Sequence, residues 1–397
     1  MRVLLATMNY PPPLYGGSVL YLNRLITHIP PENVTVLTSS KGDFEAESAY
    51  DRSQRFETIR IPVIFSYKMT LSITAKFLLI ARWFFALWRF VNPKYISVVA
   101  LDNVFYLGIP VLLICKLRRI PFVVFTFGEE LSKAPKENAS VKARVHNWIY
   151  RKTLFGASII ISISNPTTKL LEKYGVSSSK VKLIHPPTEV PQVSPSKKEI
   201  KDFLFRHQLE NKLIIASVGS FIPRKGFDKL IQAIPEVLKQ HPDAFLVLVG
   251  SGFMEPALTN LTKDLNIEEH VRFLGRIDRE ELNLLYASCE LFVMPNYTLP
   301  DGDAEGYGMV FNEANAFAKP VIGGRSGGTI DAIQHQQTGL LVDGKNVSEI
   351  AGAICTLLGN RDLARVLGKQ AQDWTKRNRS PELAANQFLD LVKALSV

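Results

Sequence analysis

The stretch Asp303–Ala318, DAEGYGMVFNEANAFA, decides the fold class of the chain. Its informative residues are, in order, Glu305, Gly306, Tyr307, Gly308, Met309, Val310 and Glu313. The pattern predicts a helix after the second glycine, and the glycines leave its first free N–H groups open to a close ligand. Those N–H groups and the helix dipole favour an anion. With a carboxylate before the helix and another inside it, the stretch suits a ligand that has phosphates and hydroxyls, such as a sugar nucleotide.

A second loop upstream carries adjacent cations. We predict a strand over Lys212–Val218 and a helix over Phe227–Lys239, and the loop between them runs from Gly219 through Arg224 and Lys225. Two cations in a glycine-bounded loop at a strand end suit a diphosphate. The alternative is a solvated turn, which the strand–loop–helix context makes the weaker interpretation.

The same plan of strand, glycine turn and helix continues toward the C-terminus. Ala244–Val249 is a predicted strand followed by Gly250, and Val271–Leu274 is a predicted strand followed by Gly275 and Arg276. After a further strand, the glycine-rich turn 324–329 enters another helix and offers its backbone N–H groups to phosphate.

The N-terminal part opens in a similar way. Arg2–Thr7 predicts a buried parallel strand, a proline-rich loop follows, and Gly16 and Gly17 open a helix. The complete Gly-x-Gly-x-x-Gly fingerprint is absent, so the two glycines can equally do no more than close a tight turn. The missing fingerprint also disfavours an NAD-dependent enzyme.

Composition describes an ordinary globular protein. The chain has 397 residues, with 46% hydrophobic and 21% charged, which predicts two domains. Its net charge of +10 suits anionic partners, although solubility alone would also explain it. Cys115, Cys289 and Cys355 are far apart in apolar runs, which indicates reduced thiols and a cytoplasmic location. The first apolar run is too short for a signal peptide.

Two segments combine aromatic residues with cations. Leu71–Val91 is a predicted helix with several Phe and Trp residues interrupted by Lys76, Arg82 and Arg89. Arginines in its middle argue against a membrane span. The two remaining interpretations are a helix that lies in a membrane interface and a core helix of the first domain with an exposed edge that touches lipid, and the core helix is favoured. Lys133–Lys152 is also basic and contains Trp148. A solvated face is the default there, and contact with an anionic lipid is the sharper hypothesis.

The sequence from Glu305 to Glu313 resembles the glutamate–seven residues–glutamate signature of family 4 retaining glycosyltransferases, which have the GT-B fold. The resemblance implies an α/β protein with two Rossmann-like parallel-sheet domains facing across a cleft. We place an acceptor-binding domain at 1–188, after which four prolines within 186–195 indicate a stiff linker. A nucleotide-sugar-binding domain follows at 189–378, and 379–397 is expected to be a helix that returns to the first domain.

The resemblance also implies roles for the residues. Arg224 and Lys225 would stabilise the leaving diphosphate, Glu305 would hold sugar hydroxyls and Glu313 the ribose. The remaining donor contacts would come from the helix start after Glu305 and from Gly16, Gly17, Gly219, Gly250 and Arg276. The family often carries His-Gly-x-Glu after a first-domain strand, but here Phe127 replaces the histidine. That departure leaves Glu129 and Glu130 as the polar candidates for acceptor contact, or as caps of the next helix.

The implied reaction transfers a hexose from a nucleoside-diphosphate sugar, with retained configuration and without a metal or other cofactor. GDP-mannose is the favoured donor and UDP-sugars are the next candidates. The acceptor would be a lipid-linked or cell-surface glycan, and the protein would lie peripherally on an anionic inner membrane face, without a nucleic-acid partner. The alternatives are a nucleotide-sugar 2-epimerase of the same fold and a non-catalytic subunit. Asp301-Gly302-Asp303 resembles a metal-binding Asp-x-Asp of another fold, but we expect it to be a solvated loop.

Overall fold

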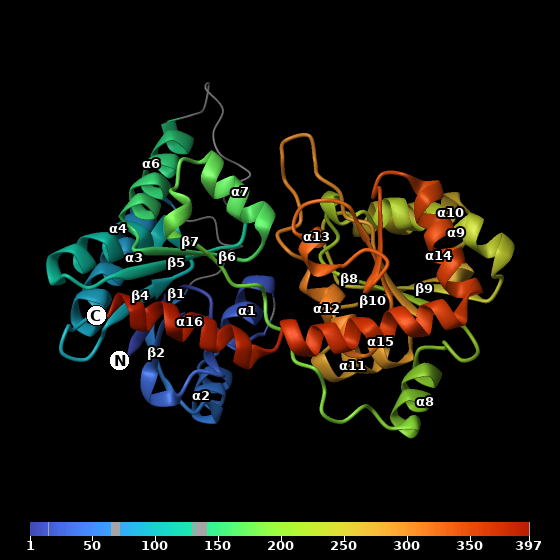
Figure 1. The fold of residues 1–397 in the computed structure, drawn as a ribbon, viewed down its shortest axis with the longest axis horizontal. Coiled ribbons are helices and arrows are strands. Elements are labelled where there is room, and N and C mark those ends of the chain that lie inside the picture. The colour runs from blue at the N-terminus through green and yellow to red at the C-terminus, as the bar shows by residue number, and fades with distance from the viewer. Residues whose placement is uncertain (15, 65–71, 129–130, 132–140, 397) are drawn as a thin grey trace. The chain divides into compact units, whose positions relative to one another are not determined.

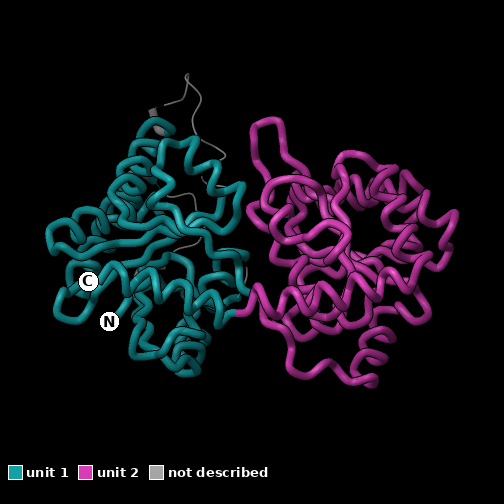
Figure 2. Tube along the Cα trace, viewed as in Figure 1, with its two compact units in different colours: residues 1–187, 381–397 teal, residues 188–380 magenta. Residues whose placement is uncertain are grey.

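The computed structural model describes residues 1–14, 16–64, 72–128, 131 and 141–396. The chain forms two compact units (Figure 2). Unit 1 comprises Met1–Pro187 and Pro381–Val397, and unit 2 comprises Thr188–Ser380. Within unit 2 the N–H of Thr188 donates to the carbonyl of Arg379 at 2.7 Å, so the segments that begin and end this unit are paired.

Unit 1 contains a seven-stranded parallel sheet in the order β3-β2-β1-β4-β5-β6-β7 (Figure 1). Its strands are β1 (Val3–Thr7), β2 (Val34–Ser40), β3 (Glu57–Ile64), β4 (Val98–Leu101), β5 (Phe122–Thr126), β6 (Ile159–Ser162) and β7 (Val181–Leu183). The central strands are short, almost wholly apolar runs because helices cover both faces of such a sheet. The strand order reverses between β1 and β4, and ligands of open α/β sheets bind beyond the carboxyl ends of the strands at such a point.

Helices surround this sheet. They are α1 (Gly17–Ile26), α2 (Phe44–Ser53), α3 (Ile73–Phe90), α4 (Val104–Arg118), α6 (Val141–Gly156), α7 (Asn165–Lys173) and α16 (Pro381–Leu395), with 3₁₀ turns η1 (Pro31–Asn33) and η2 (Ser178–Lys180). The prediction that the aromatic helix belongs to the core is confirmed for one face of α3, because Trp83 is fully buried there, whereas Phe85 is 70% exposed. At the end of the chain α16 packs against α1, and Phe388 lies 5.6 Å from Phe125 of β5, ring centroid to ring centroid.

Unit 2 repeats the architecture with a six-stranded parallel sheet in the order β10-β9-β8-β11-β12-β13 (Figure 1). The strands are β8 (Leu213–Val218), β9 (Ala244–Val249), β10 (Val271–Gly275), β11 (Leu291–Met294), β12 (Val321–Gly324) and β13 (Gly339–Val342). The order reverses between β8 and β11. The two predicted parallel-sheet domains are therefore both present.

The helices of unit 2 cover both faces of its sheet. They are α8 (Lys197–Arg206), α9 (Phe227–Gln240), α10 (Glu255–Asp264), α11 (Arg279–Ser288), α12 (Met309–Ala316), α13 (Thr329–Ala332), α14 (Val347–Gly359) and α15 (Arg361–Asn378), with 3₁₀ turns η3 (Pro223–Lys225) and η4 (Glu268–His270). α9 packs on α14, and the apolar stripe of α9, including Leu230, Ile234 and Val237, is fully buried in the core.

Within the described part of the chain, no helix combines the length and the apolar character that crossing a bilayer requires.

The three cysteines are buried and not in disulfides, as their spacing predicted.

Candidate functional site

The loops beyond the carboxyl ends of the unit 2 strands lie in backbone contact with one another. Gly250 follows β9, and a Cβ atom on it would collide with the carbonyl oxygen of Gly219, which follows β8. Gly226 has φ +73°, and a Cβ atom there would collide with the carbonyl oxygen of Pro295, after β11. Glycine is therefore required at both positions by backbone conformation and by close approach. The packing fixes the loops where the strand order reverses.

Four charged side chains from two loops meet at this reversal point. Arg224 and Lys225 follow β8, whereas Asp303 and Glu305 follow β11. The Lys225 Nζ atom lies 2.6 Å from the Glu305 Oε2 atom, and the two side chains are only 12% and 11% exposed. The Arg224 Nη1 atom lies 3.5 Å from the Asp303 Oδ2 atom. The structure thus brings together Arg224, Lys225 and Glu305, which the sequence singled out separately.

The environment keeps Glu305 ionised. Burial by itself would raise the pKa of this carboxyl. The charges of Lys225 and Arg224 and the N–H of Tyr307 outweigh that effect, so the pKa of Glu305 is lowered. A carboxylate that stays charged at neutral pH can only accept hydrogen bonds. That chemistry fits contact with sugar hydroxyls.

The expectation for Asp303 was wrong. We predicted a solvated loop for Asp301-Gly302-Asp303, and Asp301 and Gly302 are indeed exposed, but Asp303 is only 8% exposed and is paired with Arg224. Its Oδ1 atom is buried and has no hydrogen-bond partner among the described residues. The pairing was missed because Arg224 lies 79 positions away in the sequence. The position of Asp303, two residues before Glu305, was the one local signal that could have drawn attention to the pairing.

The predicted helix start is confirmed. Gly308 is the N-cap of α12 with φ +88°, a conformation that favours glycine, and Met309 and Val310 form the first turn. The structure contains no acidic residue in that first turn, so the N-terminal partial positive charge is open to an anion. Tyr307 is buried, with only 2% of the residue exposed. Only its backbone can therefore take part in donor contact.

Glu313 belongs to a different set of contacts from Glu305. Its Oε1 atom lies 3.3 Å from Nη1 of Arg279 on α11, and its Oε2 atom accepts a hydrogen bond at 3.4 Å from the hydroxyl of Tyr286. Burial and the charge of Glu313 raise the pKa of Tyr286 well above its ordinary value, so that hydroxyl remains a donor. Arg279 is a site residue that sequence reasoning missed, because its partner is on another helix.

Arg276 and Gly250 also lie on the carboxyl edge. The Nε atom of Arg276 donates to Oγ of Ser251 at 2.9 Å, so the turns after β9 and β10 are held together. Gly250 and Arg276 were both expected among the donor contacts. The contact between the two turns is consistent with a single binding surface.

Unit 1 has charged groups at its own carboxyl edge. Gly16 is the N-cap of α1 with φ +94°, and Gly17 begins the helix. Lys41 follows β2, and its Nζ atom donates at 3.3 Å to the carbonyl of Met8, which follows β1. Burial and then the charge of Arg60 lower the pKa of Lys41 to about 8, against the opposing effects of Asp102 and Glu47. Lys41 was not predicted as a site residue.

The predicted acceptor residues Glu129 and Glu130 lie outside the described residues. Phe127, in the position of the family histidine, makes an edge-to-face contact with Tyr21 at 5.7 Å between ring centroids. Its ring therefore adds apolar contact where an imidazole would add a hydrogen-bonding group.

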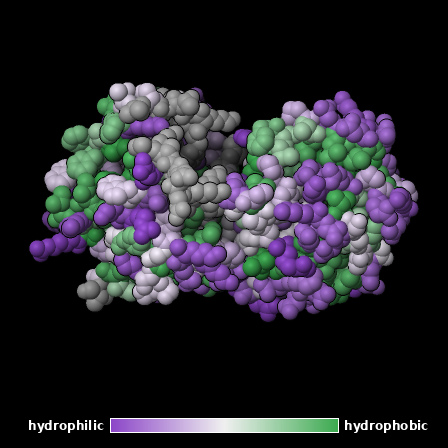
Figure 3. Space-filling view, turned by 90° about the horizontal axis from the view of Figure 1, so that it is seen from above, coloured by the Kyte–Doolittle hydropathy of each residue, from purple (hydrophilic) through white to green (hydrophobic). Residues whose placement is uncertain are grey.

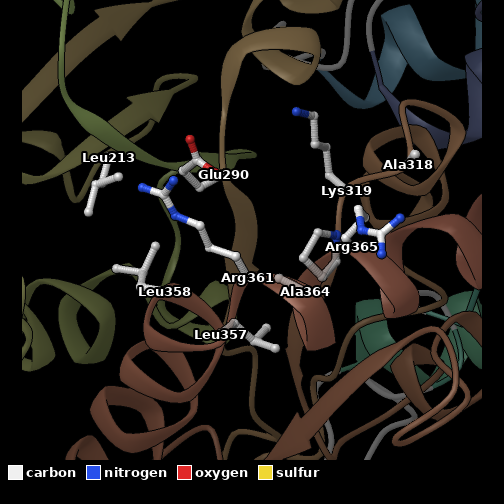
Figure 4. A pocket seen from close by; sticks show the side chains of 10 residues that line it. Leu213, Glu290, Ala318, Lys319, Leu357, Leu358, Arg361, Ala364 and Arg365 are labelled. Atoms are coloured by element: carbon white, nitrogen blue, oxygen red, sulfur yellow. The ribbon is translucent and has the colours of Figure 1, made fainter.

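A separate cavity of about 250 Å³ lies at the opposite edge of the unit 2 sheet. Leu213, Glu290 and Pro320, at or next to the amino ends of three parallel strands, are among its lining residues. Figure 4 shows Arg361 directed toward Glu290, whereas Arg365 points away from it and Lys319 extends in another direction than either arginine. These cations do not converge, so the cavity is a poor candidate for a diphosphate site.

Metal ligands are not grouped in the described ranges. Within residues 1–14, 16–64, 72–128, 131 and 141–396, no three His, Cys, Asp or Glu side chains are arranged to hold a metal ion.

The fold matches that of a solved structure over the whole chain. Anabaena HepE in complex with UDP is 20% identical to the chain, with a TM-score of 0.77 over 99% of this chain and 100% of its own. This likeness shows that the chain has the GT-B fold and confirms the predicted fold class.

Family comparisons give the more particular identity. Residues 15–190 match the description "Glycosyltransferase Family 4", and residues 199–374 match "Glycosyl transferases group 1". The chain belongs to the family 4 glycosyltransferases of GT-B fold, as the resemblance implied.

Two similar relatives have names that describe GDP-mannose-dependent mannosyltransferases. The GDP-mannose-dependent alpha-(1-6)-phosphatidylinositol monomannoside mannosyltransferase of Mycobacterium tuberculosis (strain CDC 1551 / Oshkosh) is 30% identical over 247 residues, covering 62% of this chain and 64% of that protein. The chain thus matches somewhat less than two thirds of that relative's length. The GDP-mannose-dependent monoacylated alpha-(1-6)-phosphatidylinositol monomannoside mannosyltransferase of Corynebacterium glutamicum is 28% identical, covering 99% of this chain and 98% of that protein.

Proposed function

We propose that the chain transfers a hexose from a nucleoside-diphosphate sugar to a lipid-linked or cell-surface glycan acceptor, with retention of configuration at the anomeric carbon. The observation that carries this proposal is the charged set at the strand reversal of unit 2. There Arg224 and Lys225 lie beside Glu305, directly before the open N-terminus of α12. Family membership supports the same reaction class.

The chemistry assigned to this set concerns the leaving group. The bond between the anomeric carbon and the diphosphate oxygen breaks, and negative charge grows on the diphosphate. The two cations and the first N–H groups of α12 would stabilise that charge, and removing one such group typically costs about 10²–10³-fold in turnover. The acceptor hydroxyl oxygen forms the new bond, and its proton passes to the leaving phosphate. Lys225 can serve both Glu305 and a phosphate oxygen because an ammonium has three N–H donors.

GDP-mannose is the donor we favour. The named activities of the mycobacterial and corynebacterial relatives are GDP-mannose-dependent, which supports this choice. A UDP-sugar is the next candidate, since the structural neighbour HepE holds UDP. We also propose that Arg224 and Lys225 neutralise the diphosphate without a metal, so EDTA should leave turnover unchanged.

The acceptor side of the proposal rests on unit 1. α3, α4 and α6 contain no acidic residue, and α4 packs against both α3 and α6. We call the exposed apolar side chains and the cations of these three helices the basic-aromatic surface. Its apolar members are Phe77, Leu78, Phe85, Trp88, Leu113, Leu117, Val145, Trp148 and Phe155. The cations of these helices whose side chains the structure describes are Lys76, Arg82, Arg89, Lys116, Arg118, Arg144, Arg151 and Lys152. Figure 3 shows hydrophobic and hydrophilic residues intermixed on unit 1, at the left of that view.

We propose that the basic-aromatic surface lies on an anionic membrane, where aromatic residues enter the interface and cations meet the headgroups. A Phe85→Ser/Trp148→Ser variant should sediment less with vesicles that contain anionic lipid. Phe253→Ser is the matched control, because Phe253 is 75% exposed but belongs to unit 2. Equal sedimentation of all three proteins would contradict this surface.

The test of the function itself begins with nucleotide binding. Melting curves are recorded with GDP, UDP, GDP-mannose and UDP-glucose, and one diphosphate should stabilise the protein preferentially. The preferred donor is then incubated without acceptor. Appearance of an isomer of the donor would indicate a 2-epimerase, whereas transfer that needs an added lipid-linked acceptor would support the proposal. Absence of stabilisation by every diphosphate would reject the assignment of the unit 2 site.

A further inference from the structure

Arg379, directly after α15, places a guanidinium behind the donor loops. Only 8% of this residue is exposed. Its Nε atom donates to the hydroxyl of Tyr307 at 2.6 Å, and its Nη2 atom donates to the carbonyl of Asp331 at 3.2 Å. The guanidinium also lies over the ring of Trp374, 4.3 Å from the ring centroid. One buried side chain therefore joins two segments that are distant in sequence.

Tyr307 is the contact to the first segment, the loop that carries Glu305 and leads into α12. It stands between Gly306 and Gly308, and its hydroxyl donates to Oδ1 of Asn312 on α12 at 2.7 Å. Burial, opposed by Arg379, raises the pKa of Tyr307 to about 12, so the hydroxyl remains a donor to Asn312 at neutral pH. The residue flanked by the two flexible glycines is thus fixed at its far end.

The carbonyl of Asp331 is the contact to the second segment, the glycine-rich turn 324–329 and the short helix α13 after it. This turn touches the first loop directly, because the N–H of Gly328 donates to the carbonyl of Glu305 at 2.7 Å. A Cβ atom on Gly328 would collide with the carbonyl oxygen of Gly306. The two loops therefore share one backbone contact, with Arg379 bonded to both from behind.

We infer that Arg379 is a positioning residue for the donor diphosphate, acting through Tyr307 and Asp331 rather than by touching the donor. The inference rests on the proposed function. A planar guanidinium can donate to two acceptors in fixed directions. A lysine in its place has a single ammonium group and lacks this fixed pair of donors. A displacement of about 1 Å at groups that orient a substrate can lower turnover by about 10²-fold. Holding the loops is therefore sufficient for a kinetic effect.

The test compares Arg379→Lys, Tyr307→Phe and their double variant with Arg377→Lys. Arg377 is the matched control because it lies two positions earlier, in α15, and is exposed, and its Nε donates to the carbonyl of Asp373 of the same helix at 3.2 Å. We expect Arg379→Lys and Tyr307→Phe each to lower kcat about 10- to 100-fold and to raise the donor KM, with the acceptor KM unchanged. The double variant should lose clearly less than the product of the two single effects, because both substitutions break the same Arg379–Tyr307 hydrogen bond.

The inference would be overturned if Arg379→Lys and Tyr307→Phe lost thermal stability equally while kcat and the donor KM stayed unchanged. Arg379 would then be a purely structural residue. Independent, multiplying effects of the two substitutions would overturn it as well. If Arg379→Lys does not fold, Tyr307→Phe decides the question alone, because it removes only one hydroxyl. Calorimetric binding of GDP and UDP to the unmodified protein separates the two hypotheses. No binding there rejects the proposed function, whereas binding with unaltered kinetics in the variants rejects only the role of Arg379.

Discussion

Replacing Lys225 by methionine should reveal a buried ion pair that stabilises unit 2 as well as serving turnover. The Lys225 Nζ and Glu305 Oε2 atoms are 2.6 Å apart, and both side chains are nearly buried. Removing one partner of a buried pair leaves an uncompensated charge and typically costs about 3–5 kcal/mol. Arg224 and the N–H of Tyr307 remain near Glu305, so we expect the lower end, about 3 kcal/mol. In a domain of this size that corresponds to a fall in Tm of roughly 6–12 °C.

The double variant Lys225→Met/Glu305→Gln separates stability from catalysis. It removes both charges, so most of the lost unfolding free energy should return. Turnover should remain at least about 10²-fold below that of the unmodified protein, because the cation beside the diphosphate is still absent. Urea denaturation followed by fluorescence gives the free energy of unfolding, and initial rates with the preferred donor give turnover. A double variant that is no more stable than Lys225→Met would refute the reasoning.

The pH dependence of this pair has a defined sign. The folded-state pKa of Glu305 is lowered from its ordinary value of 4.5, so the stability that it contributes is present above that pH and is lost as the pH falls below it. In Lys225→Met, burial persists without the main compensating charge, and the pKa of Glu305 should rise. The stability difference between the two proteins should therefore narrow as the pH is lowered from 7 to 4. A difference that stays constant across this range would contradict the assigned pairing.

Three further predictions concern other parts of the fold. Asp303→Asn should retain the shape of the side chain but weaken its hold on Arg224, lowering turnover about 10-fold with little change in Tm, and unchanged kinetics would show that the pairing is incidental. Gly226→Ala should destabilise the protein by at least about 1–3 kcal/mol, measured by urea denaturation, because φ is +73° and the new methyl would strike the carbonyl of Pro295. Lys41, whose pKa of about 8 lies below its ordinary value, should make the unmodified protein gain stability relative to Lys41→Met as the pH rises from 8 to 10; parallel stability curves would dismiss the lowered pKa.

Much of the candidate site was predictable because its parts are local. The strand–loop–helix unit around Arg224 and Lys225 is contiguous in sequence, and so is the glycine-flanked start of α12. Each local pattern implies its own backbone geometry through the special conformations of glycine and the free N–H groups of a helix start. The carboxyl ends of parallel strands share one edge, so these separate loops could be expected to converge.

The burial of Asp303 and the position of Arg379 were decided only by the tertiary structure. In the sequence, Asp303 is a carboxylate in a loop. Only the folded chain brings Arg224, 79 positions away, next to it. In the sequence, Arg379 is one of many cations at the end of a helix. Only the folded chain places Tyr307, 72 positions away, against it. Local sequence encodes backbone conformation and periodicity, whereas the pairing of buried polar groups depends on which distant segments the packed core brings together. The sequence by itself therefore determined the loops of the candidate site, and only the folded chain determined the groups that hold those loops in place.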